Sequence, residues 1–271
     1  MAKLTNPSGP SIRIALLHFA PRYDSVSDNV AMLKRLFLKA VELQPDLILT
    51  PELAVSGYEF CEVLGKEWIK ADGPIILEKF SRLARDHQVA LVLGIPSYEA
   101  ESDKYYNAAI FINEQGQVLG AHHKILVLPG AEAWSSPGAE IKPVAWRNHK
   151  IGLLICADAY RENIAAELAQ QGAQVLISPA AWAPGEHGPN GEWEQRSKDT
   201  GLPLLVCNRT GQGALVNFEG SSSVVVVAGR RVFEYSDQKP AILTVEVNAE
   251  NWQPRSDQFE VIELDGYPEP G

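Results

Sequence analysis

Short apolar segments separated by polar turns run along the whole chain, and their spacing predicts alternating strands and helices. Strands are expected where branched apolar residues form short runs, and helices where apolar residues recur every three or four positions. The expected strands are 11–20, 46–50, 89–94, 107–113, 117–124, 150–155, 174–178, 204–208, 222–228, 231–235 and 242–247. The expected helices are about 30–41 (capped by Ser27 or Asp28), 76–84 (opened by Gly73-Pro74), 162–171 and 191–200.

The same order of elements, strand–helix–strand–helix–strand, occurs in both halves of the chain. Residues 45–52 and 173–180 echo each other, since each is an apolar strand that stops at a Ser/Thr-Pro pair. Two such halves predict an α/β fold of two sheets with helices outside, and strand ends that gather at one edge. No linker divides the chain, so we expect one domain over residues 1–271, with a flexible N-terminus at 1–10 and a C-terminal tail at 248–271.

Composition narrows the classes of partner. The 271 residues are 45% hydrophobic, and 24 Lys and Arg against 34 Asp and Glu give a net charge of −10, which argues against nucleic acid or an anionic membrane as a partner. Three widely spaced cysteines form neither a disulfide framework nor a zinc ribbon and fit a reducing compartment. No apolar run has the length of a membrane span or the form of a signal peptide. We therefore expect a cytoplasmic protein.

Cys156 is the first candidate for chemistry. It follows the apolar strand 150–155 and precedes a turn into a helix. A thiol at a strand end that faces a helix N-terminus lies where the helix dipole favours the thiolate. Most cysteines within strands are small core residues, so position alone leaves a chemical and a structural role open.

Two charged residues also lie at strand ends. Glu52 follows the strand 46–50, where partial desolvation suits a general base. The alternative for Glu52 is a solvated loop acid. Lys124 is followed by the apolar residues 125–128, so its ammonium must either extend to solvent or pair with a carboxylate. Taken alone, it could also be an edge-strand lysine that limits aggregation. The adjacent His122 and His123 face opposite sides of a strand and have no third ligand at metal spacing, so we expect them to be structural and expect no metal or other cofactor.

Taken together, these blocks resemble the signature blocks of the nitrilase superfamily, and the resemblance covers about residues 12–247. The matching segments are Pro51-Glu52-Leu53 with Gly57-Tyr58, His123-Lys124 with Pro137-Gly138, Gly152-Leu-Leu-Ile-Cys156-Ala-Asp158, Ser178-Pro-Ala-Ala-Trp182, Cys207-Asn-Arg-Thr-Gly211 and Phe218-Glu-Gly-Ser-Ser222. Members are carbon–nitrogen hydrolases with a Glu-Lys-Cys triad. The resemblance implies a four-layer α-β-β-α sandwich that forms homodimers or larger homo-oligomers.

Carried across residue by residue, the resemblance implies that Glu52 is the general base, Lys124 the cation beside the tetrahedral intermediate and Cys156 the nucleophile. Glu132 matches a second glutamate that holds the lysine or the substrate, although the spacing to the next block is one residue short and a solvated loop acid is the alternative. A backbone N–H of Ala157 would complete the oxyanion site.

The substrate is less narrowly defined. Tyr58 and Trp182 are expected to contact it together with Ala157, and the alternative for Trp182 is a hydrophobic plug or a dimer contact. Nitrile-cleaving members show Cys-Trp-Glu where this chain has Cys156-Ala157-Asp158. The sequence therefore favours a small carboxamide, cleaved to acid and ammonia through a cysteine thioester. The alternatives are a nitrilase, an N-carbamoyl (ureido) hydrolase, a redox thiol or a non-catalytic binding member of the family.

Overall fold

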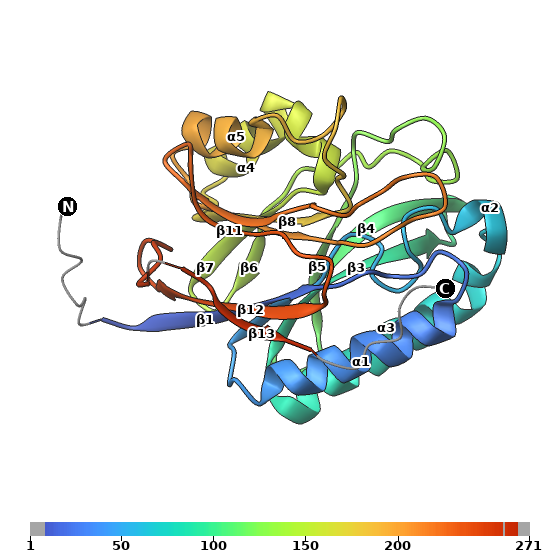
Figure 1. The fold of residues 1–271 in the computed structure, drawn as a ribbon, viewed down its shortest axis with the longest axis horizontal. Coiled ribbons are helices and arrows are strands. Elements are labelled where there is room, and N and C mark those ends of the chain that lie inside the picture. The colour runs from blue at the N-terminus through green and yellow to red at the C-terminus, as the bar shows by residue number, and fades with distance from the viewer. Residues whose placement is uncertain (1–8, 257, 265–271) are drawn as a thin grey trace.

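The computed structural model describes residues 9–256 and 258–264, which form two β-sheets packed face to face (Figure 1). The seven-stranded sheet has the order β13-β12-β1-β2-β3-β4-β5 and the six-stranded sheet the order β11-β10-β9-β8-β7-β6. The first comprises β1 (Ser11–His18), β2 (Leu47–Leu49), β3 (Ala90–Glu99), β4 (Lys104–Ile112), β5 (Val118–His123), β12 (Ala241–Asn248) and β13 (Glu260–Glu263). The second comprises β6 (Val144–Trp146), β7 (His149–Leu153), β8 (Val175–Ala180), β9 (Leu204–Asn208), β10 (Ser223–Val227) and β11 (Arg230–Tyr235).

Helices cover the outer face of each sheet. Helices α1 (Val26–Val41) and α3 (Trp68–His87) lie on the seven-stranded sheet, whereas α4 (Glu162–Gln170) and α5 (Glu192–Thr200) lie on the six-stranded sheet (Figure 1). Helices α1, α3 and α4 each bury an apolar stripe at helical spacing, as with Leu33, Leu36 and Phe37 of α1. Helix α5 is mostly polar and buries Trp193 as its one apolar side chain. A second apolar core fills the space between the sheets. The expected four-layer α-β-β-α sandwich is confirmed.

Several element boundaries differ from the sequence expectation. Ser25, rather than Ser27 or Asp28, caps α1, because its side chain accepts the N–H of Asp28 and places that acid in the first turn. Helix α3 does not open at Gly73-Pro74 but begins at Trp68, with Pro74 inside it. The buried side chain of Ile69 packs the early turns of α3 in place, which extends the helix across the proline.

The first strand begins where it was expected, whereas the end of the chain differs. Residues 1–8 of the predicted flexible N-terminus lie outside the described residues, and β1 begins at Ser11 as expected. The predicted tail from 248 is not merely a tail, because β13 pairs antiparallel with β12 and extends the sheet. Residues 257 and 265–271 lie outside the description. The division of the chain into one domain stays a prediction.

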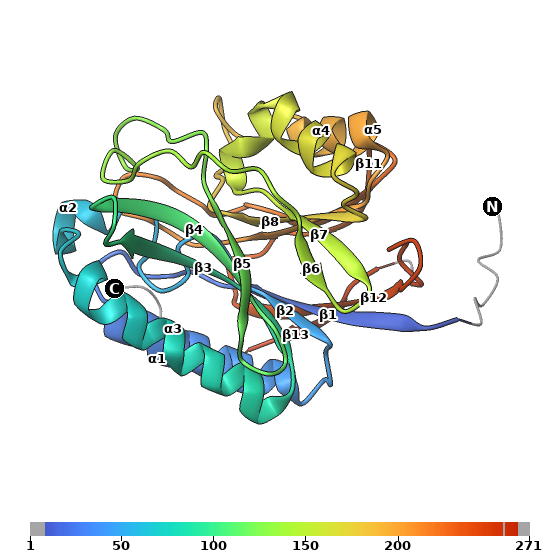
Figure 2. The same cartoon turned by 180° about the vertical axis from the view of Figure 1, so that it is seen from behind.

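The strand directions bring the candidate residues together. Strands β1, β2 and β3 are parallel, as are β7, β8 and β9, so their carboxyl ends meet at a common edge of each sheet. Strand β5 contacts β6 of the opposite sheet, and Figure 2 shows the two strands side by side. Glu52 follows β2, Lys124 follows β5, and Cys156 follows β7. Among the described helices, none is long and apolar enough to cross a membrane.

Candidate active site

The turn that carries Glu52 is held by a close approach of β3. Gly94 of β3 donates its N–H to Thr50 Oγ1 at 2.8 Å and accepts the N–H of Ala54 at 2.9 Å. A Cβ at Gly94 would lie 2.1 Å from the carbonyl oxygen of Pro51, a distance that no side chain tolerates. Glycine at this position therefore lets the turn after β2 pack against β3 and fixes the backbone of Glu52.

The carboxylate of Glu52 is buried and fully engaged. Oε1 accepts hydrogen bonds from Lys124 Nζ at 2.7 Å and from Asn107 Nδ2 at 2.7 Å. Oε2 accepts the backbone N–H of Ala181 at 2.8 Å. These three donors come from both sheets, so Glu52 lies at the junction of the two sheets. The alternative of a solvated loop acid is wrong for this residue, which is 1% exposed.

Lys124 is a buried cation shared by two carboxylates. Its ammonium pairs with Glu52 and with Glu132, and its side chain has no exposed surface. Burial alone would lower the pKa of Lys124, but the negative charges of Glu52, of a Cys156 thiolate and of Glu132 raise it well above the usual value. Lys124 is therefore charged, and the edge-strand alternative is wrong because no part of this side chain reaches solvent.

Glu132 belongs to the same cluster, as the sequence comparison implied. One of its oxygens accepts from Lys124, and Oε2 accepts the N–H of Leu128 at 2.8 Å. Burial raises the pKa of Glu132 above its usual value, against the opposing effect of Lys124. The backbone bond orients this carboxylate, so Glu132 provides a second fixed carboxylate for the ammonium beside Glu52. It is not a solvated loop acid.

Cys156 sits on a sharp turn rather than at the start of a long helix. Its φ of +49° lies in the left-handed region, its N–H donates to Ser178 Oγ at 3.3 Å, and it opens the five-residue 3₁₀-helix η1 (Cys156–Tyr160). Burial and the nearby charge of Glu52 raise the pKa of the thiol well above its usual value. The expectation that a helix N-terminus favours the thiolate is therefore wrong, and the thiol stays protonated until a base removes its proton.

The three residues expected to contact substrate lie on turns around this cluster. The Tyr58 ring centroid is 5.9 Å from Lys124 Nζ, and Ala157 is buried directly beside Cys156. Trp182 follows β8, and its indole packs against Trp193 and Tyr160 while Nε1 donates to the carbonyl of His187. Substrate contact by these three residues stays a prediction.

Sequence reasoning missed Asn107 as a site residue. Its side chain donates to Glu52, and its backbone carbonyl accepts the N–H of Lys124 at 2.8 Å, so it connects base and cation. A signal was present, because an amide within an apolar strand must find a partner when it is buried.

The adjacent histidines face opposite sides, as expected. His122 contacts the buried carboxylate of Asp158 at 2.8 Å, whereas His123 stacks on Tyr106 with ring centroids 4.0 Å apart. Among residues 9–256 and 258–264, no three His, Cys, Asp or Glu side chains are grouped so as to hold a metal ion.

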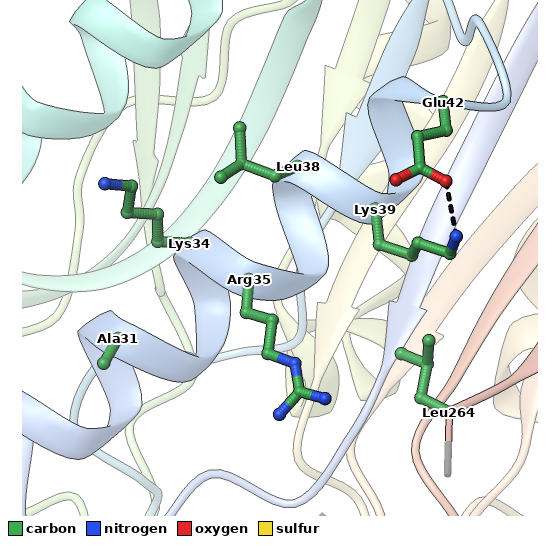
Figure 3. A pocket seen from close by; sticks show the side chains of 7 residues that line it. All are labelled: Ala31, Lys34, Arg35, Leu38, Lys39, Glu42 and Leu264. Carbon is green, nitrogen blue, oxygen red and sulfur yellow. Dashed lines mark hydrogen bonds and ion pairs between the residues drawn. The ribbon is translucent and has the colours of Figure 1, made fainter. Parts of the chain in front are cut away.

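A cavity of about 440 Å³ lies elsewhere, on the outer side of α1. Figure 3 shows its lining, which comes from one helix and from the residue after β13: Ala31, Lys34, Arg35, Leu38, Lys39, Glu42 and Leu264. None of these residues belongs to the Glu52–Lys124–Cys156 cluster. This cavity is thus separate from the candidate chemistry, which is enclosed among buried side chains.

This chain is similar to several known proteins over most of its length. The chain is 26% identical over 252 residues to a probable nitrilase of Schizosaccharomyces pombe, covering 89% of this chain and 90% of that protein. It is 27% identical to an N-carbamoylputrescine amidase of Solanum tuberosum, covering 87% and 85%. A crystal structure of an amidase from Nesterenkonia sp. AN1, in complex with acrylamide, superposes with a TM-score of 0.78 at 27% identity and covers 91% of this chain and 94% of that one.

The family model that matches is described as carbon-nitrogen hydrolase and spans residues 13–256. That range includes every strand from β2 to β12 and the turns that carry Glu52, Lys124 and Cys156. The two stacked sheets, with helices outside, are also those of the amidase structures. This chain is therefore a carbon–nitrogen hydrolase, an amidase-like member of the nitrilase superfamily.

Proposed function

We propose that this enzyme hydrolyses a small carboxamide to a carboxylic acid and ammonia through a thioester on Cys156. The observation that carries the proposal is the buried ammonium of Lys124, which pairs with both Glu52 and Glu132 near Cys156, a thiol whose pKa burial raises. A base, a fixed cation and a nucleophile in one water-excluded cluster suit acyl transfer.

The first half of the reaction forms the thioester. Glu52 removes the thiol proton as the sulfur of Cys156 attacks the carbonyl carbon, and a C–S bond forms. The Lys124 ammonium and the backbone N–H of Ala157 stabilise the oxyanion of the tetrahedral intermediate. The intermediate collapses, the C–N bond breaks, and Glu52 returns the proton to the departing ammonia.

The second half releases the acid. Glu52 takes a proton from water as the water oxygen attacks the thioester carbonyl, and the same cation holds the new oxyanion. The C–S bond then breaks, the carboxylic acid leaves, and the proton held by Glu52 restores the thiol. Glu132 keeps Lys124 in place throughout, because its second oxygen is fixed by the N–H of Leu128.

The structural neighbours support these roles. One Nesterenkonia amidase structure shows covalent addition of the acetamide moiety of fluoroacetamide at the active-site cysteine, and another holds butyramide. The acrylamide complex carries substitutions at a glutamate and a cysteine whose separation along that chain equals the separation of Glu52 and Cys156. The acrylamide and butyramide bound to that amidase are small, neutral amides, which suits a site with so little exposed surface.

Hydrolysis of an N-carbamoyl compound is a second candidate. Its support is the match to N-carbamoylputrescine amidases and to a citrullinase of Francisella tularensis, which is 25% identical over 245 residues. Both reactions release ammonia and use the same nucleophile, so the triad does not separate them. Nitrile cleavage has less support, because Cys156 is followed by Ala157-Asp158.

Ammonia release from a panel of simple amides, nitriles and ureido acids separates the three classes. We expect release from butyramide or acrylamide, no acid from the corresponding nitriles, and slower release from ureido acids. Cys156→Ala run alongside gives the background. Ammonia from ureido acids alone would replace the carboxamide proposal with the second candidate, and no release from any compound would contradict both.

Two further predictions from the sequence accompany this proposal. Assembly into a homodimer or a larger homo-oligomer is supported by the superfamily resemblance alone. A cytoplasmic location is supported by the three unpaired cysteines, which the structure shows as free thiols.

A further inference from the structure

We propose that Asp158, oriented by His122, is a positioning residue that sets the placement of Lys124 relative to Cys156 across the two sheets. The inference rests on the proposed function, because it assigns Lys124 and Cys156 to the same reaction. What it adds is a residue pair outside the triad that holds the cation and the nucleophile in register.

The carboxylate of Asp158 accepts four hydrogen bonds. Oδ1 accepts the backbone N–H groups of Ile125 at 3.0 Å and Leu126 at 2.8 Å. Oδ2 accepts the backbone N–H of Ile155 at 3.0 Å and lies 2.8 Å from His122 Nε2, which donates to it. All the acceptor positions of this buried carboxylate are thus used.

The donors belong to two segments that come from different sheets. His122 lies one residue before the end of β5 in the seven-stranded sheet, and Ile125 and Leu126 follow Lys124 directly. Ile155 and Asp158 flank Cys156 after β7 of the six-stranded sheet. The donors therefore bracket Lys124 on one segment, and the carboxylate and Ile155 bracket Cys156 on the other, so a single side chain ties the cation to the nucleophile.

Asp158 has the charge this role requires. Burial opposes ionisation, but the hydrogen bond and charge of His122 and the N–H groups of Leu126 and Ile155 keep the pKa of Asp158 below its usual value. An ionised acceptor with several donors is rigid and strongly bound. His122 supplies the donor that comes from a side chain, which makes it the partner that can be changed without altering the backbone.

The adjacent histidine provides a matched control. His122 and His123 lie on the same strand, but His123 points to the other side, where it stacks on Tyr106 and reaches no residue of the triad. We compare His122→Leu, His122→Gln and His123→Leu in the full-length enzyme, by steady-state kinetics on an amide that the wild type hydrolyses and by thermal unfolding.

Loss of the donor at position 122 is expected to lower kcat roughly 10- to 100-fold with little change in KM, because a displacement of about 1 Å at reacting groups has effects of this size. His122→Gln, whose amide can still donate to Asp158, is expected to recover most of the rate. His123→Leu is expected to keep near wild-type kcat. Rates are expressed per folded enzyme, so that a purely structural loss does not lower kcat.

Three outcomes would overturn the inference: unchanged kcat in His122→Leu, an equal fall in His123→Leu, or a failure of His122→Gln to exceed His122→Leu. Any of these leaves the proposed function intact provided that the wild type releases ammonia and Cys156→Ala does not. If the wild type hydrolyses no amide, the proposed function fails first and the positioning role fails with it.

Discussion

Cys156→Ala is expected to abolish amide hydrolysis while the protein stays folded. The sulfur forms the bond that carries the acyl group, so its removal should lower kcat by roughly 10⁴-fold or more, the scale seen when a covalent nucleophile is removed. The cost in folding free energy should be only about 1 kcal/mol, because the thiol is small and uncharged and makes no ion pair. Ammonia release and thermal unfolding measure the two effects separately.

Cys207 supplies the control for this substitution. It is as deeply buried as Cys156, and its thiol donates to the carbonyls of Leu17 and Leu49 rather than to any catalytic group. Cys207→Ala removes the same atom from the same kind of environment and should destabilise the protein by at least as much, yet keep its activity. Equal loss of activity in the two variants would show that core disruption, rather than loss of the nucleophile, explains the result.

Lys124→Met is expected to affect both activity and stability. Removal of an oxyanion donor typically lowers kcat by about 10²–10³-fold. In addition, the substitution leaves the buried carboxylates of Glu52 and Glu132 without their shared cation, and breaking a buried pair in this way costs about 3–5 kcal/mol. The structure therefore predicts that Lys124 supports the fold as well as the reaction.

The stability defect of Lys124→Met should depend on pH in a defined direction. Burial already raises the pKa of Glu132 in the wild type, and loss of the cation raises it further. The folded variant therefore binds more protons than the unfolded chain above the usual carboxyl pKa, so its stability falls as pH rises through the raised pKa. The gap between variant and wild type should narrow on acidification toward pH 5. A gap that is constant with pH would contradict the shared-cation arrangement.

Local patterns were sufficient for most of the fold. The apolar run 204–208 became β9 with the predicted bounds, and the two halves became two stacked sheets. Helix α3 begins earlier than predicted, at Trp68. Burial of the Ile69 side chain stabilises its first turns by more than Pro74 destabilises the helix. The three-residue strand β6 is too short to produce a recognisable period.

The candidate site was predictable only where residues stand in family blocks. Glu52, Lys124, Cys156 and Glu132 all lie in the cluster that the structure shows. Asn107 and Asp158 were not identified as site residues. Asn107 contacts Glu52, which is 55 positions away in the sequence, and Asp158 contacts His122, which is 36 positions away, so these pairs become neighbours only in the folded protein. The pKa of the thiol was also predicted with the wrong sign, since burial and Glu52 outweigh the short helix that follows.

The central claim is a covalent acyl-enzyme on Cys156, and peptide mass spectrometry after an acid quench tests it most directly. The wild type is quenched in acid while it turns over butyramide and is then digested, and Cys156→Ala is treated in the same way as the background. We predict a mass increase of one acyl group less one hydrogen on the peptide that carries Cys156, and not on those with Cys61 or Cys207. An acyl group on another residue, or turnover by the wild type with no adduct on Cys156, would contradict the account.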